Sequence, residues 1–474
     1  LKNADGIQVD VKTGLSNEEL IGIIGQYDGL AIRSGTEVTA DVLKAASNLK
    51  VVGRAGIGID NVDLGAASKR GVVVMNTPGG NTITTAEHTI SMMLSLSRKI
   101  PQATKSLKSS KWEKKKFMGV EIYNKVLGII GFGKIGQIVS SLARGLQMNV
   151  IVYDPFISKD VVQKTGVEVV DLDALFKRSD YITLHVPSTK KTKNLICEET
   201  IKKMKPTVRI INCARGGIIN EADLLKAIKT KKIAGAALDV FEKEPPGENP
   251  LLLLDEVICT PHLGASTDEA QENVAVAVAE QIVDYLINGQ IRNAINVPSV
   301  DAETLKKIQP YLYLGEKLGS LQAQLSKGRI QQINIIYSGE VAKMETSPIT
   351  LAVLKGLLSV FIETDLNMVN APVIAKERGI EVLESRSSES HDFTSLISVI
   401  VTTDEESKTV EGTLFGKEDT RIVRIDEYHI EASPEGNMLV FSNLDAPGVI
   451  GKIGTILGNN KINIAGFNLC RKMV

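Results

Sequence analysis

The sequence is poor in cysteine, and the few cysteines that it contains lie far apart. Cys197, Cys213, Cys259 and Cys470 form no CxxC pair and no cluster with histidine. This spacing lacks the usual ligand pattern of a structural zinc site, and it suits a compartment in which thiols stay reduced. We therefore expect neither a metal ion nor a disulfide framework.

The sequence also lacks an excess of charge of either sign, and it lacks long apolar runs. Its 55 lysines and arginines against 56 acidic residues leave a net charge of −1, so no basic field attracts nucleic acid or an anionic membrane. No run of about 18 apolar residues could cross a bilayer, and no signal-peptide pattern opens the chain. We expect a cytoplasmic protein that binds a small molecule. Because the sequence begins at Leu1 rather than methionine, a removed leader stays open.

What the sequence does contain, from residue 30 onward, is an alternation of short apolar runs with amphipathic stretches. This rhythm is typical of βα units around a parallel sheet. A first set of strands is predicted at 30–33, 50–54 and 72–76. A second set is predicted at 126–131, 150–154, 181–186, 208–214, 236–240 and 257–260. Together they predict an α/β fold with two Rossmann-like, doubly wound parallel-sheet domains, followed by α+β domains.

Changes in this pattern predict where the domains meet. A capping box at 266–269 opens a long helix expected to end near Asn288, and residues 293–298 would then return to the first domain. The predicted domains are 1–97 with 289–298 for substrate, 98–288 for the cofactor, 299–433 as a separate α+β domain, and 434–474. The last segment predicts strand, helix and strand at 438–442, 449–459 and 462–465, a unit so small that the sequence is expected to stop within a domain.

A glycine-rich turn follows the predicted strand at 126–131 and opens an amphipathic helix. A GxGxxG motif alone is weak evidence, but here a second strand ends in Asp154 about 20 residues further on, as in the dinucleotide-binding fingerprint. The helix N-terminus favours a pyrophosphate, and Asp154 would accept hydrogen bonds from a ribose and repel a 2′-phosphate, which favours NAD over NADP. The alternative is a βα turn that binds nothing. The predicted contacts here are Gly131, Gly133, Lys134, Ile135, Gly136 and Asp154.

Polar residues follow three predicted strands of the cofactor domain, where ligands of open α/β sheets bind. Arg215 can pair with a carboxylate and polarise a neighbouring oxygen. His262 can take a hydroxyl proton near neutral pH, while Glu244 stabilises the imidazolium and selects its tautomer. Singly, each residue would more often be a surface ion pair, a structural histidine or a solvated loop residue. Their shared sheet edge instead predicts oxidation of a 2-hydroxy acid.

Further residues at these strand ends are expected to line the cofactor. Asp239 is expected to hold the nicotinamide carboxamide, while His185 and Pro187, after another strand, would line the cofactor pocket. His262 is preferred as the base over His88, which falls inside a predicted helix.

Several blocks of sequence resemble the D-2-hydroxyacid dehydrogenases, namely residues 131–136, 212–217, 237–241 and 260–264. In that family these blocks bind NAD and carry the arginine, glutamate and histidine of catalysis, which correspond here to Arg215, Glu244 and His262. By the same resemblance Cys213, Ala214 and Gly264 also face the cofactor. Within the family, residues 52–61 and 75–78 look most like the branch that oxidises D-3-phosphoglycerate, the first step of the phosphorylated route to L-serine.

The resemblance places the substrate contacts on Arg33, Ser34, Arg54, Gly56 and Asn81. Both arginines end strands of the first domain, so two cations would suit a substrate with a phosphate at its far end. This favours phosphoglycerate over lactate or glycerate. The alternative is that these arginines only form ion pairs or cap their strands.

The rest of the chain resembles the long form of this branch. Residues 300–433 look like its intervening allosteric substrate-binding domain, and residues 444–451 look like the start of an ACT domain, a small module that binds amino acids. By resemblance, Asn443, Asp445 and Asn463 would contact L-serine, and Asp445 also resembles a helix start. The alternative is a helix cap without a ligand. A complete ACT domain is βαββαβ, so with its first half alone the response to serine stays open.

Two other functions are compatible with this sequence pattern, and the chain is expected to form an oligomer. The same chemistry on another substrate would give a glyoxylate or hydroxypyruvate reductase, whereas a non-enzymatic NADH-sensing scaffold would share the fold but not need the intact Arg215, Glu244 and His262. We expect a homodimer or homotetramer, because the basic connection at 98–118, which contains Trp112, and the terminal segment need partners to bury apolar surface.

Overall fold

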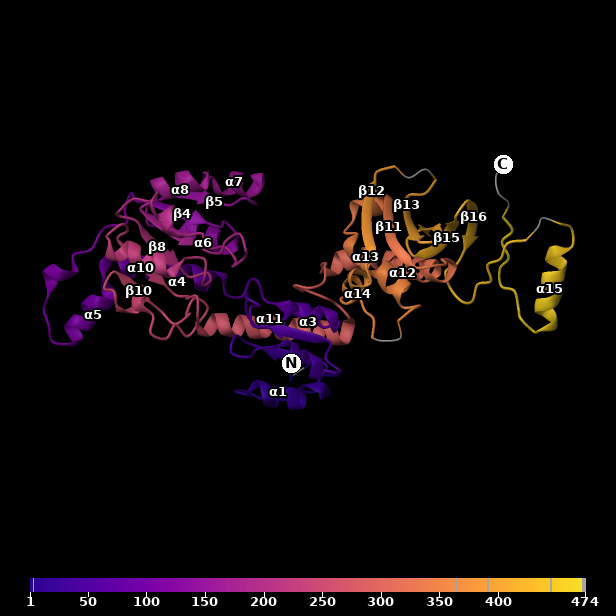
Figure 1. The fold of residues 1–474 in the computed structure, drawn as a ribbon, viewed down its shortest axis with the longest axis horizontal. Coiled ribbons are helices and arrows are strands. Elements are labelled where there is room, and N and C mark those ends of the chain that lie inside the picture. Colours follow the sequence, from indigo (N-terminus) through magenta and orange to yellow (C-terminus); the bar gives the residue numbers. More distant parts are fainter. Residues whose placement is uncertain (3, 363–364, 390–391, 444–445, 471–474) are drawn as a thin grey trace. The chain divides into compact units, whose positions relative to one another are not determined.

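The computed structural model describes residues 1–2, 4–362, 365–389, 392–443 and 446–470. The chain divides into two compact units, which Figure 1 shows in the colours of the sequence. The first unit comprises Leu1–Asn76 and Val278–Val474, and the second unit comprises Thr77–Ala277. The domain boundaries predicted above stay a prediction.

The second unit is built on a seven-stranded parallel sheet with the order β10-β9-β8-β7-β4-β5-β6. Its strands are β4 Val126–Ile130, β5 Asn149–Tyr153, β6 Glu168–Val169, β7 Tyr181–Leu184, β8 Arg209–Asn212, β9 Gly235–Leu238 and β10 Val257–Cys259. Every strand predicted for this sheet is present. The sequence did not predict β6, which is only two residues long and has both side chains exposed. The chain order reverses at β4, which lies between β5 and β7, and ligands of such sheets bind at this switch point.

Helices cover both faces of this sheet, so the predicted doubly wound fold is confirmed. One apolar cluster packs Met93 of α4 and Val139 of α6 against one face, and another packs Phe176 of α8 and Leu224 of α10 against the other. The central strands are mostly apolar, as in β4, because both of their faces are buried. The helices of this unit are α4 Thr82–Arg98, α5 Ile100–Lys108, η2 Lys114–Phe117, α6 Lys134–Gly145, α7 Lys159–Thr165, α8 Leu172–Arg178, α9 Glu198–Ile201, α10 Glu221–Lys229 and η3 Pro250–Leu253.

The first unit begins with a parallel sheet, β1 Gly29–Ile32, β2 Val51–Arg54 and β3 Val73–Asn76. Its helices are α1 Asn17–Ile23, η1 Ile24–Gln26, α2 Ala40–Ala45 and α3 Leu64–Lys69. The long helix α11, Asp268–Asn288, leads from the second unit into the first, and Ala294 then bridges Met75 while Asn296 accepts the Val74 N–H at 2.9 Å. Ala294 and Asn296 thus contact β3, while the discontinuous domain stays a prediction.

The remainder of the first unit contains a six-stranded mixed sheet with the order β12-β11-β13-β14-β15-β16. The strands are β11 Ile330–Gly339, β12 Glu381–Ser387, β13 Ser395–Thr403, β14 Ser407–Phe415, β15 Asp419–Ile425 and β16 Tyr428–Ala432. Its helices are α12 Ala302–Leu325, η4 Glu340–Lys343, α13 Ser347–Leu358 and α14 Ala371–Glu377. Leu314 and Leu318 of α12 share a core with Ile335 and Val399 of the sheet, which is an α+β arrangement.

Some local predictions were wrong. Thr267 rather than Ser266 caps α11, accepting the Ala270 N–H at 3.2 Å. The helix α15, Val449–Asn459, is confirmed, but its N-cap is Gly448 and Asp445 lies outside the described residues. The strands predicted at 438–442 and 462–465 are not formed, because a strand needs a paired neighbour to be stable. Among the described residues, no helix is long and apolar enough to cross a bilayer.

Candidate active site

The three predicted catalytic residues follow three neighbouring strands. β8, β9 and β10 are parallel and adjacent, so their carboxyl ends meet at the same edge, and Arg215, Glu244 and His262 lie in the segments that leave them. The first two segments pack closely, since a Cβ on Gly216 would lie 1.8 Å from the Phe241 carbonyl oxygen. The topology thus brings a guanidinium, a carboxylate and an imidazole to one sheet edge.

His262 and Glu244 form a direct pair. Nδ1 of the imidazole lies 2.6 Å from Oε2 of the carboxylate, and both side chains are partly exposed. The other carboxylate oxygen accepts the Phe241 N–H at 3.1 Å, which holds Glu244 from its own loop. A carboxylate on Nδ1 selects the tautomer that carries its proton there, and so leaves Nε2 free to exchange a proton with a ligand.

Arg215 lies in a turn that Asn212 shapes. The buried Asn212 amide donates to the Arg215 carbonyl at 2.9 Å, and its oxygen accepts the Ala214 N–H at 3.0 Å. The guanidinium is half-buried and donates through Nη1 to the Ala214 carbonyl at 2.7 Å. The backbone of Arg215 is thereby held by the last residue of β8.

Asp239 is fully buried behind this edge and organises the segment that follows His262. Its carboxylate accepts the N–H groups of Leu263 at 2.7 Å and Gly264 at 2.8 Å, and it also accepts the Thr260 hydroxyl at 2.6 Å. His88 of α4 places Nε2 3.2 Å from the same carboxylate. Burial disfavours the charge, but these hydrogen bonds outweigh it, and the pKa of Asp239 is lowered.

No sequence motif indicated the contact with His88 or the group of possible metal ligands around it. His88, Cys213 and Asp239 place one donor atom each within 4.8 Å of one another. Burial, together with the charge of Asp239, raises the pKa of Cys213 to about 12, so its thiol keeps its proton near neutral pH. Within this group the direct contact is the one between His88 Nε2 and the Asp239 carboxylate, at 3.2 Å.

The glycine-rich turn after β4 has the shape that a dinucleotide needs. Gly131 has a φ of 93°, and a Cβ there would lie 2.5 Å from the His185 carbonyl oxygen, while one on Gly136 would lie 2.3 Å from the Gly131 carbonyl oxygen. A Cβ on Gly133 would meet no described atom within 4 Å. Gly133 is exposed and is the N-cap residue of α6, where no side-chain hydrogen bond from the described chain caps the helix. The first N–H groups of α6 are thus accessible to a pyrophosphate, so these residues fit NAD.

Asp154 and His185 flank this turn. The Asp154 carboxylate accepts the Phe132 N–H at 2.7 Å and the Phe156 N–H at 2.8 Å, and it retains lone pairs for ribose hydroxyls. Burial lowers the pKa of His185 to about 4, so a neutral imidazole lies beside the turn. The other predicted cofactor contacts are Lys134 and Pro187, which are exposed, Ile135 and Ala214, which are half-buried, and Cys213 and Gly264, which are buried.

Comparisons with known proteins agree with this geometry. Residues 90–264 match the NAD binding domain of the D-isomer specific 2-hydroxyacid dehydrogenases, and residues 307–426 match the D-3-phosphoglycerate dehydrogenase intervening domain. The D-3-phosphoglycerate dehydrogenase of Synechocystis sp. is 48% identical over 98% of this chain and 84% of its own length, and that of Archaeoglobus fulgidus is 47% identical over 98% and 88%. The chain belongs to the D-3-phosphoglycerate dehydrogenase family. It is an NAD-dependent dehydrogenase.

Solved structures resemble part of this dehydrogenase. D-2-hydroxyisocaproate dehydrogenase aligns with a TM-score of 0.55 at 28% identity, covering 60% of this chain and 91% of its own. The apo form of D-lactate dehydrogenase from Escherichia coli aligns with a TM-score of 0.54 at 29% identity, covering 59% and 89%. These likenesses support the predicted fold of the catalytic part of the family.

The predicted substrate residues of this dehydrogenase fall in both units. In the first unit, Arg33 and Ser34 are exposed just after β1, while Arg54 ends β2 and Gly56 follows with a φ of 136°. In the second unit, Asn81 is the buried N-cap residue of α4, and its side-chain oxygen has no partner among the described residues. Their roles toward substrate stay a prediction.

The predicted effector residues lie at the C-terminal end of the described chain. Asn443 and Asn463 are exposed and belong to segments that carry no helix or strand, and Asp445 lies outside the described residues. The serine site and the ACT domain therefore stay predictions.

Proposed function

We propose that this dehydrogenase oxidises the C2 hydroxyl of D-3-phosphoglycerate with NAD, forming 3-phosphohydroxypyruvate and NADH in the first step of the phosphorylated route to L-serine. The observation that carries the proposal is the contact of 2.6 Å between His262 Nδ1 and Glu244, at the sheet edge to which Arg215 also belongs. Relatives that match nearly the whole chain and are named D-3-phosphoglycerate dehydrogenase support the choice of substrate.

In the proposed mechanism each side chain has one task. Arg215 binds the substrate carboxylate and polarises the C2 oxygen. His262 takes the hydroxyl proton at Nε2, and Glu244 stabilises the imidazolium that forms. The hydroxyl proton goes to His262, and the electron pair of the O–H bond forms the second C2–O bond. The hydrogen on C2 leaves as a hydride, with the electron pair of the C2–H bond. NAD, when bound at the turn after β4, supplies the acceptor for this hydride.

The proposal assigns the substrate contacts to the five residues that the sequence predicted. Arg33 and Arg54 would pair with the phosphate, and Ser34, Gly56 and Asn81 would complete the substrate contacts. A phosphate carries two negative charges or nearly so, and paired arginines bind it through charge-assisted hydrogen bonds. A 2-hydroxy acid without the phosphate would forgo these bonds.

The test is a steady-state assay of NADH formation with D-3-phosphoglycerate, D-glycerate and D-lactate, and of NADH consumption with glyoxylate and hydroxypyruvate. We expect kcat/KM to favour the phosphorylated acid by at least about tenfold, and Arg54→Ala to remove most of that preference. His262→Ala should lower kcat/KM by about 10²–10⁴-fold. Equal use of glyoxylate would indicate the reductase instead, and full turnover by His262→Ala would favour the NADH-sensing scaffold.

The same assay repeated with L-serine tests the predicted effector site. Inhibition that Asn443→Ala and Asn463→Ala relieve would support it, because neither residue belongs to the proposed catalytic machinery. Unchanged rates at all serine concentrations would contradict it.

A further inference from the structure

We propose that Glu221 is a positioning residue, whose carboxylate braces both ends of the loop that carries Glu244. The inference rests on the proposed function, in which Glu244 orients His262. Glu221 was not among the residues that the sequence singled out. The hydrogen bonds of its carboxylate and its N–H within the described chain go to Glu242 and Asn249, not to His262 or Glu244.

The loop in question, residues 242–249, has no helix or strand of its own. Glu221 holds its two ends with the two oxygens of one carboxylate. Oε1 accepts the Glu242 N–H at 2.6 Å, and Oε2 accepts the side-chain amide of Asn249 at 2.6 Å. Glu244 lies between Glu242 and Asn249. The Glu221 carboxylate therefore holds the chain on both sides of Glu244.

The brace has a rigid base on both sides. Glu221 is the first residue of α10, whose Leu224 and Ile228 are buried in the core of the second unit. Its own N–H donates to the Glu242 carboxylate at 3.3 Å, so the contact is reciprocal. Asn249 in turn accepts the Leu251 N–H at 3.0 Å and caps η3. The loop is thus tied between two helical segments through charged hydrogen bonds, which are stronger than neutral ones.

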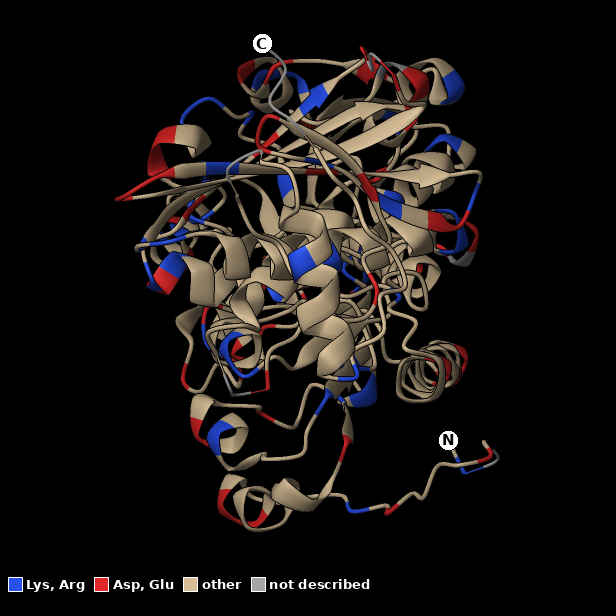
Figure 2. Cartoon of the chain, turned by 90° about the vertical axis from the view of Figure 1, so that its right-hand side faces the viewer, with Lys and Arg blue, Asp and Glu red and all other residues tan. Residues whose placement is uncertain are grey.

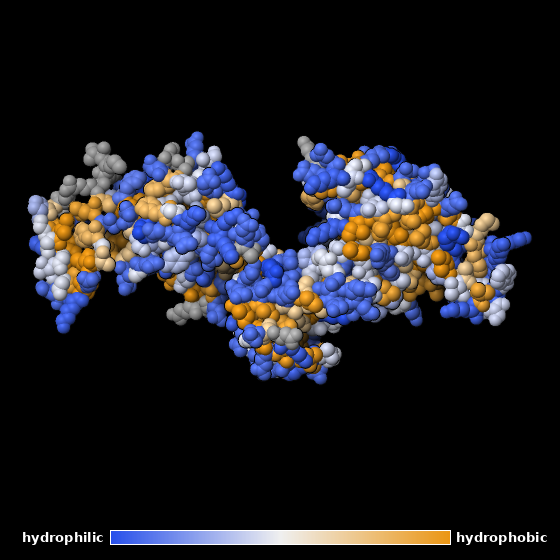
Figure 3. All heavy atoms as spheres, turned by 180° about the vertical axis from the view of Figure 1, so that it is seen from behind, coloured by the Kyte–Doolittle hydropathy of each residue, from blue (hydrophilic) through white to orange (hydrophobic). Residues whose placement is uncertain are grey.

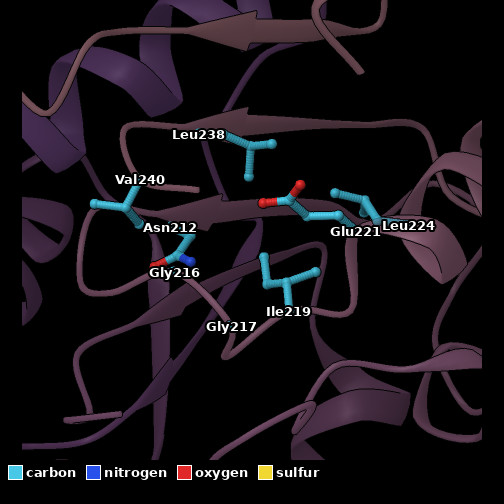
Figure 4. A pocket seen from close by; sticks show the side chains of 8 residues that line it. All are labelled: Asn212, Gly216, Gly217, Ile219, Glu221, Leu224, Leu238 and Val240. Atoms are coloured by element: carbon cyan, nitrogen blue, oxygen red, sulfur yellow. The ribbon is translucent and has the colours of Figure 1, made fainter. Parts of the chain in front are cut away.

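The surroundings of Glu221 explain why these partners matter. Its carboxylate points into a small pocket, with Leu238 and Ile219 on either side and Gly216 and Gly217 nearby (Figure 4). A half-buried anion among apolar side chains depends on its hydrogen bonds, because few waters can replace them. The glycines are those that follow Arg215, so the same pocket wall joins the Arg215 turn to the Glu244 loop.

Loss of the brace should therefore affect proton transfer and spare cofactor binding. Without Glu221 the loop gains freedom, and Glu244 no longer remains 2.6 Å from His262 Nδ1. The glycine-rich turn after β4 contains no contact with Glu221 among the described residues, so the affinity for NADH should not change. This split between kcat and cofactor binding is what distinguishes positioning from a general loss of structure.

The first experiment compares kcat, the KM for NAD and the affinity for NADH in four proteins: wild type, Glu221→Ala, Glu221→Gln and Glu248→Ala. Glu248 is the matched control, an exposed glutamate of the same loop with no hydrogen bond or ion pair to the described chain. We expect Glu221→Ala to lower kcat about tenfold with both cofactor parameters unchanged. Glu221→Gln, which keeps an acceptor for the Glu242 N–H, should recover part of this loss, and Glu248→Ala should match wild type.

The second experiment asks whether Glu221 acts through Glu244. Glu244→Gln alone should lower kcat, and adding Glu221→Ala to it should cause no further decrease, because the group being positioned is already lost. Losses that multiply would overturn the proposal. If Glu221→Ala fails to fold, the same cycle with Asn249→Ala, which removes one of the two hydrogen bonds, applies the test.

The third experiment separates this inference from the proposed function, because it needs no turnover. Hydrogen exchange of the peptide that covers 242–249 should be faster in Glu221→Ala than in Glu248→Ala. If that holds while wild type leaves phosphoglycerate unchanged, the brace stands and the proposed function fails. If wild type is active and Glu244→Gln is impaired, but Glu221→Ala matches Glu248→Ala in exchange and in kcat, the brace is wrong.

Discussion

His262 adopts a left-handed backbone conformation, with a φ of 54°, which costs a residue with a side chain roughly 1–2 kcal/mol. Asp239 offsets this cost, because its carbonyl accepts the His262 N–H at 2.9 Å and its carboxylate accepts the next two N–H groups. A buried charge is thus used to hold a strained segment, and strain of this kind gathers at functional sites. His262 is therefore positioned by Asp239, a residue from which β10 separates it along the chain.

The neutral state of His185 leads to a prediction for acid stability. Burial lowers the pKa of His185 to about 4, whereas the unfolded chain takes up its proton near 6.5. Between these values the unfolded state binds more protons, so the free energy of unfolding decreases as the pH falls from about 6.5 toward 4. His185→Gln should flatten this dependence, by up to about 3 kcal/mol between the two limits.

The measurement is denaturant unfolding at pH 7 and at pH 5. His429→Gln is the control, since His429 is exposed on β16, and it should leave the difference between the two pH values as in wild type. An unchanged difference in His185→Gln would contradict the prediction.

At the scale of elements, the glycine-rich turn shows three glycines retained for different physical reasons. Gly131 is needed for its positive φ and its contact with the His185 backbone, and Gly136 for the close approach of α6 to the turn. Gly133 touches nothing of the described chain that a Cβ would displace. Packing within the described chain therefore does not require glycine at this position. Close approach of a bound dinucleotide to the backbone would require it.

We predict that Gly133→Ala folds as wild type does but binds NADH at least about tenfold more weakly, because an added methyl group at a close contact costs about 1–3 kcal/mol. Thermal unfolding and quenching of protein fluorescence by NADH measure the two effects. Gly136→Ala provides the contrast, since its Cβ would lie 2.3 Å from the Gly131 carbonyl oxygen and should lower the melting temperature as well. Wild-type affinity in Gly133→Ala would place the pyrophosphate elsewhere.

At the scale of the whole molecule, charges of both signs lie on the surface, and large apolar side chains are exposed there as well. Both basic and acidic residues are scattered over the elements visible in Figure 2. Apolar side chains are exposed on the connection around α5 and on the segment around α15, and the orange areas of Figure 3 show that apolar residues also reach the surface elsewhere. The exposed residues around α5 and α15 are Ile100, Leu107, Trp112, Met118, Tyr123, Ile450, Ile456, Ile462, Ile464, Phe467 and Leu469.

These surfaces support the expected homo-oligomer, since exposed apolar patches of a soluble protein usually mark an interface. Light scattering should give the mass of two or four chains. Trp112→Glu should reduce that mass, because Trp112 is 83% exposed in the single chain and would be buried in an assembly. Val11→Glu, at a residue that is 67% exposed in the first unit, should leave the mass unchanged. A monomeric mass for the wild type would contradict the expectation.

The sequence by itself determined the strands of the parallel sheets except β6, the glycine-rich turn and the positions of Arg215, Glu244 and His262. These features are local: a strand buried on both faces is an apolar run, and a polar residue directly after it must lie at the sheet edge. The pair between Glu244 and His262 was predictable because parallel neighbouring strands end on the same side.

Tertiary structure alone decided which side chains hold these residues in place. His88 of α4 contacts Asp239, which follows β9, and Glu221 accepts a hydrogen bond from Asn249, 28 residues further along the chain. Neither periodicity nor a motif in the sequence indicates these pairs. The strands predicted at 438–442 and 462–465 failed for a related reason, because a strand exists only through hydrogen bonds to a neighbour that the local sequence does not specify. Contacts between distant residues depend on packing, whereas the elements that pack depend on the order of polar and apolar residues along the chain.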